Sequence, residues 1–347
     1  MKIKSVVATY TVRERPANPI RDALQVLDGG GSVHVTIETD DGLVGKSSTG
    51  FGRLRAAPGI LAQIINEELA PEIIGDDPFL VRGIRDKLWK HTDYHGSTGL
   101  SLFGISAIDI ALWDLMGKAA GLPVWRLLGG QRTSVPCYAM VGWLNFDLDQ
   151  VKAQCLRAVK QGFKAVKMKV GCPTLEEDIQ RIEAVQAEVG DDVHVMVDAN
   201  QVFSLNEALR RGRVYEDLGC YWFEEPLRAD DHDGLAELAA QLDIPVASGE
   251  NDFGKRQFRD LFVKKSVDIV QPDLRRAGGL TECFEIGLMA DAFNVPYASH
   301  GGGVHLHVLA ALPNTLYMET GFLPEDGSIV LTDGRYPLPE KPGFGLE

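Results

Sequence analysis

The stretch AVKMKVGCPTLEEDIQRIEAVQAEVGDDVHVMVDAN, residues 165–200, contains two short apolar runs separated by an amphipathic segment. The runs AVKMKVG and VHVMVDAN have the length and the β-branched content of buried strands. The segment LEEDIQRIEAVQAEVG between them repeats its apolar residues every three or four positions, as a helix does. Because strands that alternate with helices favour crossover connections, this unit predicts an α/β fold with a parallel sheet.

The same unit recurs along the chain between about residue 126 and residue 320. Eight strand-like runs follow one another there: VPCYAMVG, AVKMKVG, VHVMVDAN, CYWFEEP, IPVASGEN, VDIVQPD, VPYASHGGG and TLYMETG. Eight such strands predict a closed (β/α)8 barrel, whose active site lies at the C-terminal ends of the strands. An open doubly wound sheet would carry a glycine-rich phosphate turn after its first strand, and the sequence has none there.

The residues on either side of the barrel have a different texture. Residues 1–125 begin with alternating, strand-like patterns and continue from about residue 57 with helical ones, which predicts an α+β capping domain. Residues 321–347 are too rich in proline and glycine to continue the barrel, so we expect this tail to pack back on the capping domain. The predicted division is therefore 1–125, 126–320 and 321–347.

The composition limits the classes of partner. The formal net charge is −14, which repels nucleic acid and anionic membranes. No run of eighteen apolar residues is present, and the five cysteines are scattered without a Cys-x-x-Cys pair. We expect a cytoplasmic protein that acts on a small molecule, with neither nucleic acid nor membrane as partner.

Seven consecutive predicted strands end in an ionisable residue. Successive tips are 19 to 29 residues apart, about one strand–helix unit each: Lys169, Asp198, Glu224, Glu250, Asp273, His300 and Glu319. Charge scattered over a surface would not recur at the period of the fold. We therefore expect these side chains to meet at one mouth of the barrel.

Three of these residues, Asp198, Glu224 and Glu250, are carboxylates from neighbouring strands. Oxygen ligands with open positions between them suit a hard divalent cation, and Mg²⁺ is the predicted cofactor. A zinc site is disfavoured because the set has no His or Cys. In the alternative interpretation, the acids pair with Lys167 and Lys169, which share a face of their strand because they are two residues apart.

His300 and Asp273 lie on adjacent predicted strands and form a candidate acid/base dyad, since a carboxylate raises the basicity of a neighbouring imidazole. Lys169 would face this dyad from another part of the mouth. We expect Lys167 to lower the pKa of Lys169, because a like charge nearby favours the neutral amine. A neutral lysine can accept a proton.

These motifs, VKMKVG, VDAN, FEEP, SGEN, QPD, SH and MET in this order, resemble those of the enolase superfamily, and specifically its mandelate racemase subgroup. The resemblance covers nearly the whole chain. It implies that Asp198, Glu224 and Glu250 hold Mg²⁺, and that Lys169 and His300, backed by Asp273, serve as two bases on opposite faces of the substrate α-carbon.

The resemblance also implies roles for the remaining residues. Lys167 and Asn200 would contact the carboxylate of a hydroxy acid, and Glu319 would protonate or hydrogen-bond the developing enediolate. Similar proteins are often homo-oligomers, and we expect the same of this chain.

Two bases on opposite faces permit either dehydration or racemisation and epimerisation. The loop of the first domain, which closes the site in similar proteins, carries Arg15 and Arg21 here, and this suits a polyhydroxylated acid. We therefore predict an acid-sugar dehydratase that converts an aldonate or aldarate into a 2-keto-3-deoxy acid. A racemase or epimerase, a non-catalytic sugar-acid-binding protein, and a phosphate-binding barrel enzyme using the glycines at 301–303 are the alternatives.

Overall fold

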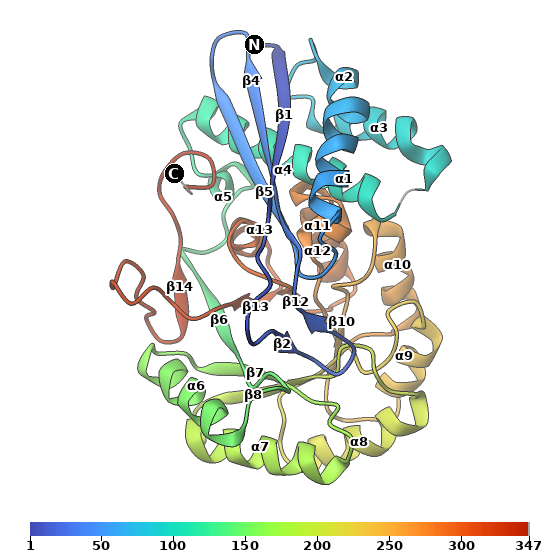
Figure 1. Cartoon of the computed structure of the whole chain (residues 1–347), viewed down its shortest axis with the longest axis vertical. Helices are drawn as coiled ribbons and strands as arrows, with labels where there is room; N and C mark the ends of the chain where they lie inside the picture. Colours follow the sequence, from blue (N-terminus) through green and yellow to red (C-terminus); the bar gives the residue numbers. More distant parts are fainter. Residues whose placement is uncertain (97, 346–347) are drawn as a thin grey trace.

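The computed structural model describes residues 1–96 and 98–345 and contains a closed barrel (Figure 1). Each strand of the barrel is parallel to the next, and the last pairs with the first. The strands are β6 (Ser134–Val141), β7 (Ala165–Lys169), β8 (His194–Asp198), β9 (Phe223–Glu224), β10 (Val246–Ser248), β11 (Ile269–Val270), β12 (Tyr297–Ser299) and β13 (Thr315–Thr320). The predicted fold class is confirmed.

Helices connect successive strands and cover the outside of the barrel (Figure 1). They are α6 (Leu148–Lys160), α7 (Leu175–Val189), α8 (Leu205–Asp217), α9 (His232–Ala239), α10 (Gly254–Lys264), α11 (Leu274–Ala277), α12 (Leu280–Ala292) and α13 (His305–Ala311). Helices α6 and α7 each begin with a capping box, made by Asp147 with Gln150 and by Thr174 with Glu177. These reciprocal bonds satisfy backbone N–H groups that a helix start leaves without partners.

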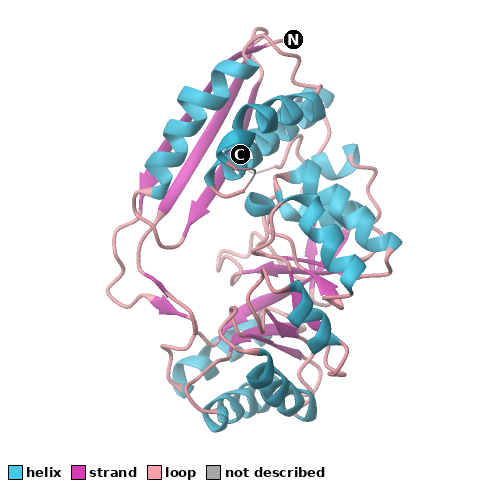
Figure 2. Ribbon diagram, turned by 90° about the vertical axis from the view of Figure 1, so that its right-hand side faces the viewer, coloured by secondary structure: helices cyan, strands magenta, loops and turns pink. Residues whose placement is uncertain are grey.

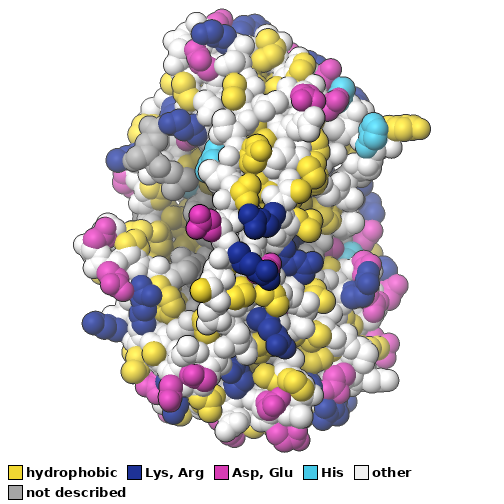
Figure 3. Space-filling view, viewed as in Figure 1, with side chains coloured by type: hydrophobic (Ala, Val, Ile, Leu, Met, Phe, Trp, Pro, Cys, Tyr) yellow, Lys and Arg dark blue, Asp and Glu magenta, His cyan; other side chains and the backbone are white. Residues whose placement is uncertain are grey.

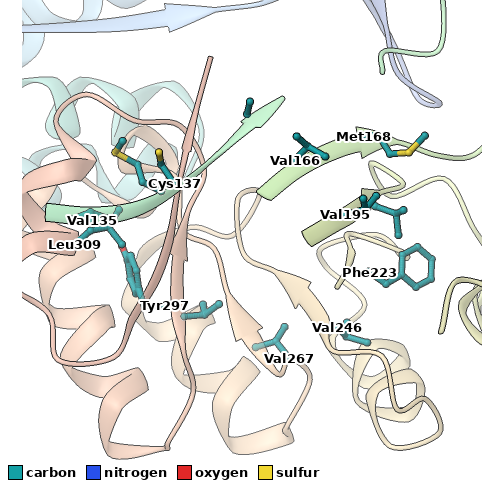
Figure 4. Close-up of a cluster of buried hydrophobic side chains, with 14 of the residues drawn as sticks. Val135, Cys137, Val166, Met168, Val195, Phe223, Val246, Val267, Tyr297 and Leu309 are labelled. Carbon is teal, nitrogen blue, oxygen red and sulfur yellow. The ribbon is translucent and has the colours of Figure 1, made fainter. Parts of the chain in front are cut away.

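The two faces of each barrel strand have different surroundings. In β7, Val166 and Met168 belong to the apolar layer between strands and helices (Figure 4), whereas Ala165 belongs to the cluster that fills the barrel interior. Because side chains alternate along a strand, Lys167 and Lys169 point the same way as Ala165. The interior cluster contains Tyr138, Ala165, Met196, Trp222, Ala247, Ile269 and Ala298. An apolar floor thus lies beneath the charged strand tips.

The capping domain has a hydrophobic core of its own. Its sheet is antiparallel in the order β1–β4–β5, made by β1 (Ile3–Val12), β4 (Gly31–Thr39) and β5 (Val44–Phe51). The helical elements are α1 (Ala57–Ile64), the π-helix η1 (Ile65–Leu69), α2 (Ala70–Ile73), α3 (Val81–Thr92), the 3-10 helix η2 (Asp93–His95), α4 (Leu100–Ala120) and α5 (Val124–Leu127). Figure 2 shows this domain above the barrel.

Helix α4 is long and apolar enough, by length and composition, to cross a membrane. However, 78% of its apolar window is buried inside the protein. It packs on the capping sheet on one side and on α11 and α12 of the barrel on the other. Trp113 donates a hydrogen bond to Thr281 across this contact, and Ser106 donates one to the backbone carbonyl of Arg275. The apolar composition of α4 is therefore explained by its place between the two domains.

Two segments outside the regular domains reach the barrel. The tail adds strand β14 (Arg335–Pro337), antiparallel to β6, and then bonds through Gly343 and Phe344 to α5 and α4 of the capping domain. The loop after β1 forms a hairpin, β2 (Ile20–Arg21) with β3 (Val26–Leu27), that lies over the barrel strands in Figure 1. The hairpin is bonded to Leu144 and Asn145, which follow β6.

Candidate active site

The structure brings the seven strand-tip residues together at one mouth of the barrel. Each lies at or just beyond the end of its strand. The last residues of β7, β8 and β9 are Lys169, Asp198 and Glu224, and the last but one of β13 is Glu319. The ends of β10, β11 and β12 are followed within three residues by Glu250, Asp273 and His300. Asp198 is in register with both Lys169 and Glu224, and a backbone bridge joins Asp273 to His300. The parallel register of the strands thus places ionisable groups side by side.

Lys167 points into the barrel and is only 1% exposed. Its ammonium group pairs with Glu224, with Glu319 at 2.6 Å and with Asp198 at 3.4 Å. Burial alone would lower the pKa of Lys167, but these carboxylates raise it well above its ordinary value. Lys167 is therefore a permanent cation.

Lys169 lies nearer the opening and has fewer anionic partners. Its Nζ is 2.5 Å from Oδ2 of Asp198 and 4.9 Å from the centroid of the Trp143 ring. Burial lowers the pKa of Lys169, and Lys167 lowers it too, as expected, but Asp198 and the neighbouring glutamates raise it above its ordinary value overall. The expectation of a lowered pKa is thus wrong for this arrangement, because the adjacent carboxylate outweighs the adjacent cation.

Asp273 and His300 form a hydrogen-bonded dyad, with 2.7 Å between Oδ2 and Nδ1. The carboxylate also accepts hydrogen bonds from the backbone N–H groups of Arg275 and Arg276 and pairs with the Arg275 guanidinium. Although burial opposes ionisation, Arg275 and His300 hold the pKa of Asp273 well below its usual range. An ionised carboxylate only accepts, so Nδ1 of His300 carries the proton.

The other ring nitrogen of His300 faces acidic groups. Its Nε2 lies 3.3 Å from Glu250 and 4.0 Å from Glu319. Burial lowers the pKa of His300, but Glu250, the bond to Asp273 and Glu319 together raise it above its ordinary value. The imidazole therefore favours its protonated form, and its side chain is still 23% exposed to the mouth.

The predicted metal ligands do not converge on one point in this arrangement. Among residues 1–96 and 98–345, no three His, Cys, Asp or Glu side chains are placed so that they could hold a metal ion. Asp198 and Glu224 are bonded to the two lysines, and Glu250 faces His300. The ammonium groups occupy the carboxylate oxygens that the sequence assigned to a cation.

The donor set nevertheless fits a hard cation. Burial, together with Asp198, Glu319 and Glu250, raises the pKa of Glu224 to about 8 even though Lys167 opposes this. Two buried oxygens beside these acids, Oδ1 of Asn200 and Oε2 of Glu225, have no hydrogen-bond partner in the described part of the chain. Carboxylate and amide oxygens that lack a hydrogen-bond donor are the kind of ligand that Mg²⁺ prefers.

Sequence reasoning missed several residues that hold the strand-tip acids. Trp222 and Gln271 donate hydrogen bonds to Oε2 of Glu224 at 3.1 and 2.9 Å, and Tyr138 donates one to Glu319 at 3.0 Å. A signal was available for two of them. Trp222 and Gln271 stand two positions before a strand-tip acid, and residues two apart in a strand share a face.

The two arginines predicted to contact substrate, Arg15 and Arg21, lie at the surface on the loop after β1. Arg15 pairs with Asp28 at 2.5 Å, and its side chain is 70% exposed. Arg21 is held through its backbone N–H, which donates to the side chain of Asn145. Figure 3 shows lysine and arginine side chains grouped at the centre of this face, where the capping domain meets the barrel. The contact of Arg15 and Arg21 with substrate remains a prediction.

Two family models together match nearly all of the chain. Residues 6–129 match the mandelate racemase / muconate lactonizing enzyme N-terminal domain, and residues 150–347 match the enolase C-terminal domain-like family. The chain belongs to the enolase superfamily, in its mandelate racemase subgroup. The family that the motifs indicated is thereby confirmed.

Relatives in this superfamily cover the chain almost completely. The arabinonate dehydratase of Saccharolobus solfataricus is 36% identical over 98% of this chain and 95% of its own length. The L-talarate/galactarate dehydratase of Salmonella typhimurium LT2 is 37% identical over 89% of this chain and 78% of its own length. These names confirm the prediction of an enzyme of the hydro-lyase class.

Solved structures of the superfamily have the same fold. The crystal structure of the Salmonella typhimurium L-talarate/galactarate dehydratase matches with a TM-score of 0.92 and 34% identity, covering 99% of this chain and 89% of that one. A mutant of that enzyme is described as liganded with Mg and L-glucarate. A racemase from Streptomyces coelicolor A3(2) with bound magnesium also matches, with a TM-score of 0.92 and 32% identity over 99% of this chain and 96% of that one.

Proposed function

We propose that this enzyme carries out the Mg²⁺-dependent dehydration of an acid sugar, an aldonate or aldarate, to a 2-keto-3-deoxy acid. The observation that carries the proposal is the pair of proton-transfer groups at one mouth, Lys169 on β7 and the Asp273–His300 dyad after β11 and β12. The relatives named as dehydratases of acid sugars support the substrate class.

In the first step Lys169, as the neutral amine, removes the proton from the α-carbon of the substrate. The electron pair of the broken C–H bond moves into the carboxylate, which becomes an enediolate. This second negative charge needs preorganised stabilisation. Lys167 supplies part of it as a permanent cation, and the side-chain amide of Asn200 would donate a hydrogen bond to the same oxygens. Although burial raises the pKa of Glu319, Lys167 and His300 lower it to about 2, so Glu319 would contribute only after it takes up a proton.

Asp198, Glu224 and Glu250 would hold the magnesium ion, which when bound stabilises the negative charge on the substrate carboxylate. Asp198 would then no longer favour the ammonium form of Lys169, because its own charge is engaged. The lysine that is paired in the present arrangement would thus become able to accept a proton.

In the second step His300 acts as a general acid. It donates the proton on Nε2 to the β-hydroxyl, which leaves as water, and the resulting enol tautomerises to the 2-keto-3-deoxy acid. The raised pKa of His300 favours the protonated imidazole, and Asp273 fixes the ring by accepting from Nδ1. Arg15 and Arg21, on the loop above the mouth, would contact the more distant hydroxyls or a second carboxylate.

Racemisation or epimerisation is the second candidate. The same two groups could remove a proton from one face and return it to the other, and a similar solved structure is described as a racemase. The two reactions differ in whether His300 returns a proton to carbon or expels a hydroxyl. The product therefore distinguishes them.

The test is a screen of aldonates and aldarates with the Mg²⁺-loaded enzyme in D₂O, with detection of 2-keto acids and of α-deuterium. We expect a 2-keto product from at least one acid, loss of it in Lys169→Ala and His300→Asn, and full activity in Lys152→Ala, an exposed lysine of α6. Deuterated epimer without 2-keto acid would establish the second candidate, and neither product from any acid would refute both.

A further inference from the structure

The loop between β6 and α6, residues 142–147, places an aromatic ring on the proposed base. The centroid of the Trp143 ring lies 4.9 Å from Nζ of Lys169, while Oδ2 of Asp198 lies 2.5 Å from the same atom. A cation within about 6 Å of an indole face is attracted to it. The ammonium group is thus held between a carboxylate and an aromatic face.

The barrel fixes this loop from one side. Arg181, a buried residue of α7, donates hydrogen bonds to the carbonyls of Phe146 at 2.8 Å, Trp143 at 3.0 Å and Gly142 at 3.3 Å. Gly142 has φ +64°, and a Cβ there would lie 3.1 Å from Cβ of Met168, so the turn requires glycine. The position of Trp143 is therefore set by rigid elements.

The capping domain holds the same loop from the other side. Leu144 donates its backbone N–H to the carbonyl of Arg21 at 2.9 Å, and the N–H of Arg21 donates to Oδ1 of Asn145 at 3.0 Å. The side-chain amide of Asn145 also reaches Asn18 at 3.4 Å. The hairpin above the mouth and the ring on Lys169 thus share one short segment of chain.

We propose that Trp143 is a positioning residue for Lys169, and that Asn145, by joining the loop to the hairpin, keeps the indole in place. The inference rests on the proposed function, in which Lys169 takes the α-proton. Trp143 acts through the lysine, because its ring limits the directions in which the amine can point. Loss of the aromatic face is then expected to slow proton transfer without weakening substrate binding.

The test compares Trp143→Phe, which keeps an aromatic face, with Trp143→Leu, which keeps only apolar bulk. We expect Trp143→Phe to retain kcat within about threefold, and Trp143→Leu to lose about tenfold in kcat and in the rate of α-deuterium exchange, with KM changed less than about threefold. Asn145→Ala is expected to lose part of kcat alone and nothing further in the Trp143→Leu background. Trp89→Leu on α3, a partly exposed tryptophan of the capping domain, is the matched control and should retain full activity.

A second measurement tests the contact without turnover. With ¹³C-labelled lysine, the Lys169 signal, assigned by its loss in Lys169→Ala, should show an upfield ring-current shift in the wild type and Trp143→Phe and none in Trp143→Leu. The proposal would be overturned if Trp143→Phe and Trp143→Leu kept the kcat of the wild type or lost it equally. It would also be overturned if only KM changed, or if the wild type showed no ring-current shift. A wild type without turnover that keeps the shift would refute the proposed function and leave the contact established.

Discussion

Replacing Asp273 by asparagine should shift the pH dependence of the reaction in a defined direction. The substitution removes a negative charge 2.7 Å from Nδ1 of His300 and leaves the size of the side chain unchanged. Asp273 also caps α11 by accepting from two backbone N–H groups, and asparagine is an equally good N-cap. The variant therefore keeps the helix cap, while it removes the negative charge beside His300 and beside the Arg275 guanidinium.

The magnitude follows from the strength of the bond that is lost. A hydrogen bond to a charged group contributes about 1.5–3 kcal/mol, which corresponds to a factor of about 10 to 100 in the proton affinity of His300. A general acid works only when it is protonated, and Asp273 is one of the groups that raise the pKa of His300. Without this carboxylate the basic limb of the pH–rate profile moves to lower pH. At pH values above the basic limb of the wild type, the rate should fall by about 10- to 100-fold, and it should recover in part in acid.

Initial rates of 2-keto acid formation between about pH 6 and pH 10 measure this effect. A double-mutant cycle is the control, because Asp273→Asn should cost nothing further in a His300→Asn background if Asp273 acts through the imidazole. Thermal unfolding of each variant shows whether the fold is retained. A basic limb that stays in place or moves to higher pH, or an additive loss in the cycle, would refute the role assigned to the dyad.

Three further perturbations have expected outcomes. Mg²⁺ should raise the unfolding temperature of the chelator-treated protein, because an ion at one hundred times its Kd adds about 2.7 kcal/mol to the free energy of unfolding. Asp198→Asn should reduce this shift in temperature. Equal melting curves with and without Mg²⁺ would contradict the proposed site. Lys167→Met should lower the free energy of unfolding in urea by about 3–5 kcal/mol, because it removes the cation beside Glu224 and Glu319 and leaves Asp198 with Lys169 alone. An unchanged midpoint would contradict this. Tyr138→Phe should lower kcat by about two- to tenfold through the lost bond to Glu319, with kcat equal to wild type as the contrary result.

Local periodicity was sufficient to predict the barrel and the identity of its charged tips. The two-residue spacing of Lys167 and Lys169 places both on one face as soon as the segment is a strand. The recurrence of one ionisable residue per strand–helix unit then predicts a common mouth. Both inferences depend only on geometry that every strand shares.

Contacts between distant segments could not be predicted in this way. The bond between Arg21 and Asn145 joins residues 124 positions apart, and no periodic pattern in the loop after β1 indicates the hairpin that makes it. The pairing of β14 with β6 likewise depends on tertiary packing, and so does the contact of the Trp143 ring with Lys169. The direction of the pKa shift of Lys169 was mispredicted for the same reason, since it depends on how close Asp198 lies to the amine.

The depth of the two lysines explains why they would have different roles. Lys167 touches three carboxylates from three strands, so a cation that drew Asp198 and Glu224 away would still leave it the bond to Glu319. Lys169 touches one, and the loss of Asp198 would leave it facing mainly Trp143 and the opening. A charge with several anionic partners holds its proton through the reaction, whereas a charge with one partner can exchange it when that partner is engaged. This difference supports the proposal that Lys169 transfers the proton and that Lys167 gives fixed stabilisation to the enediolate.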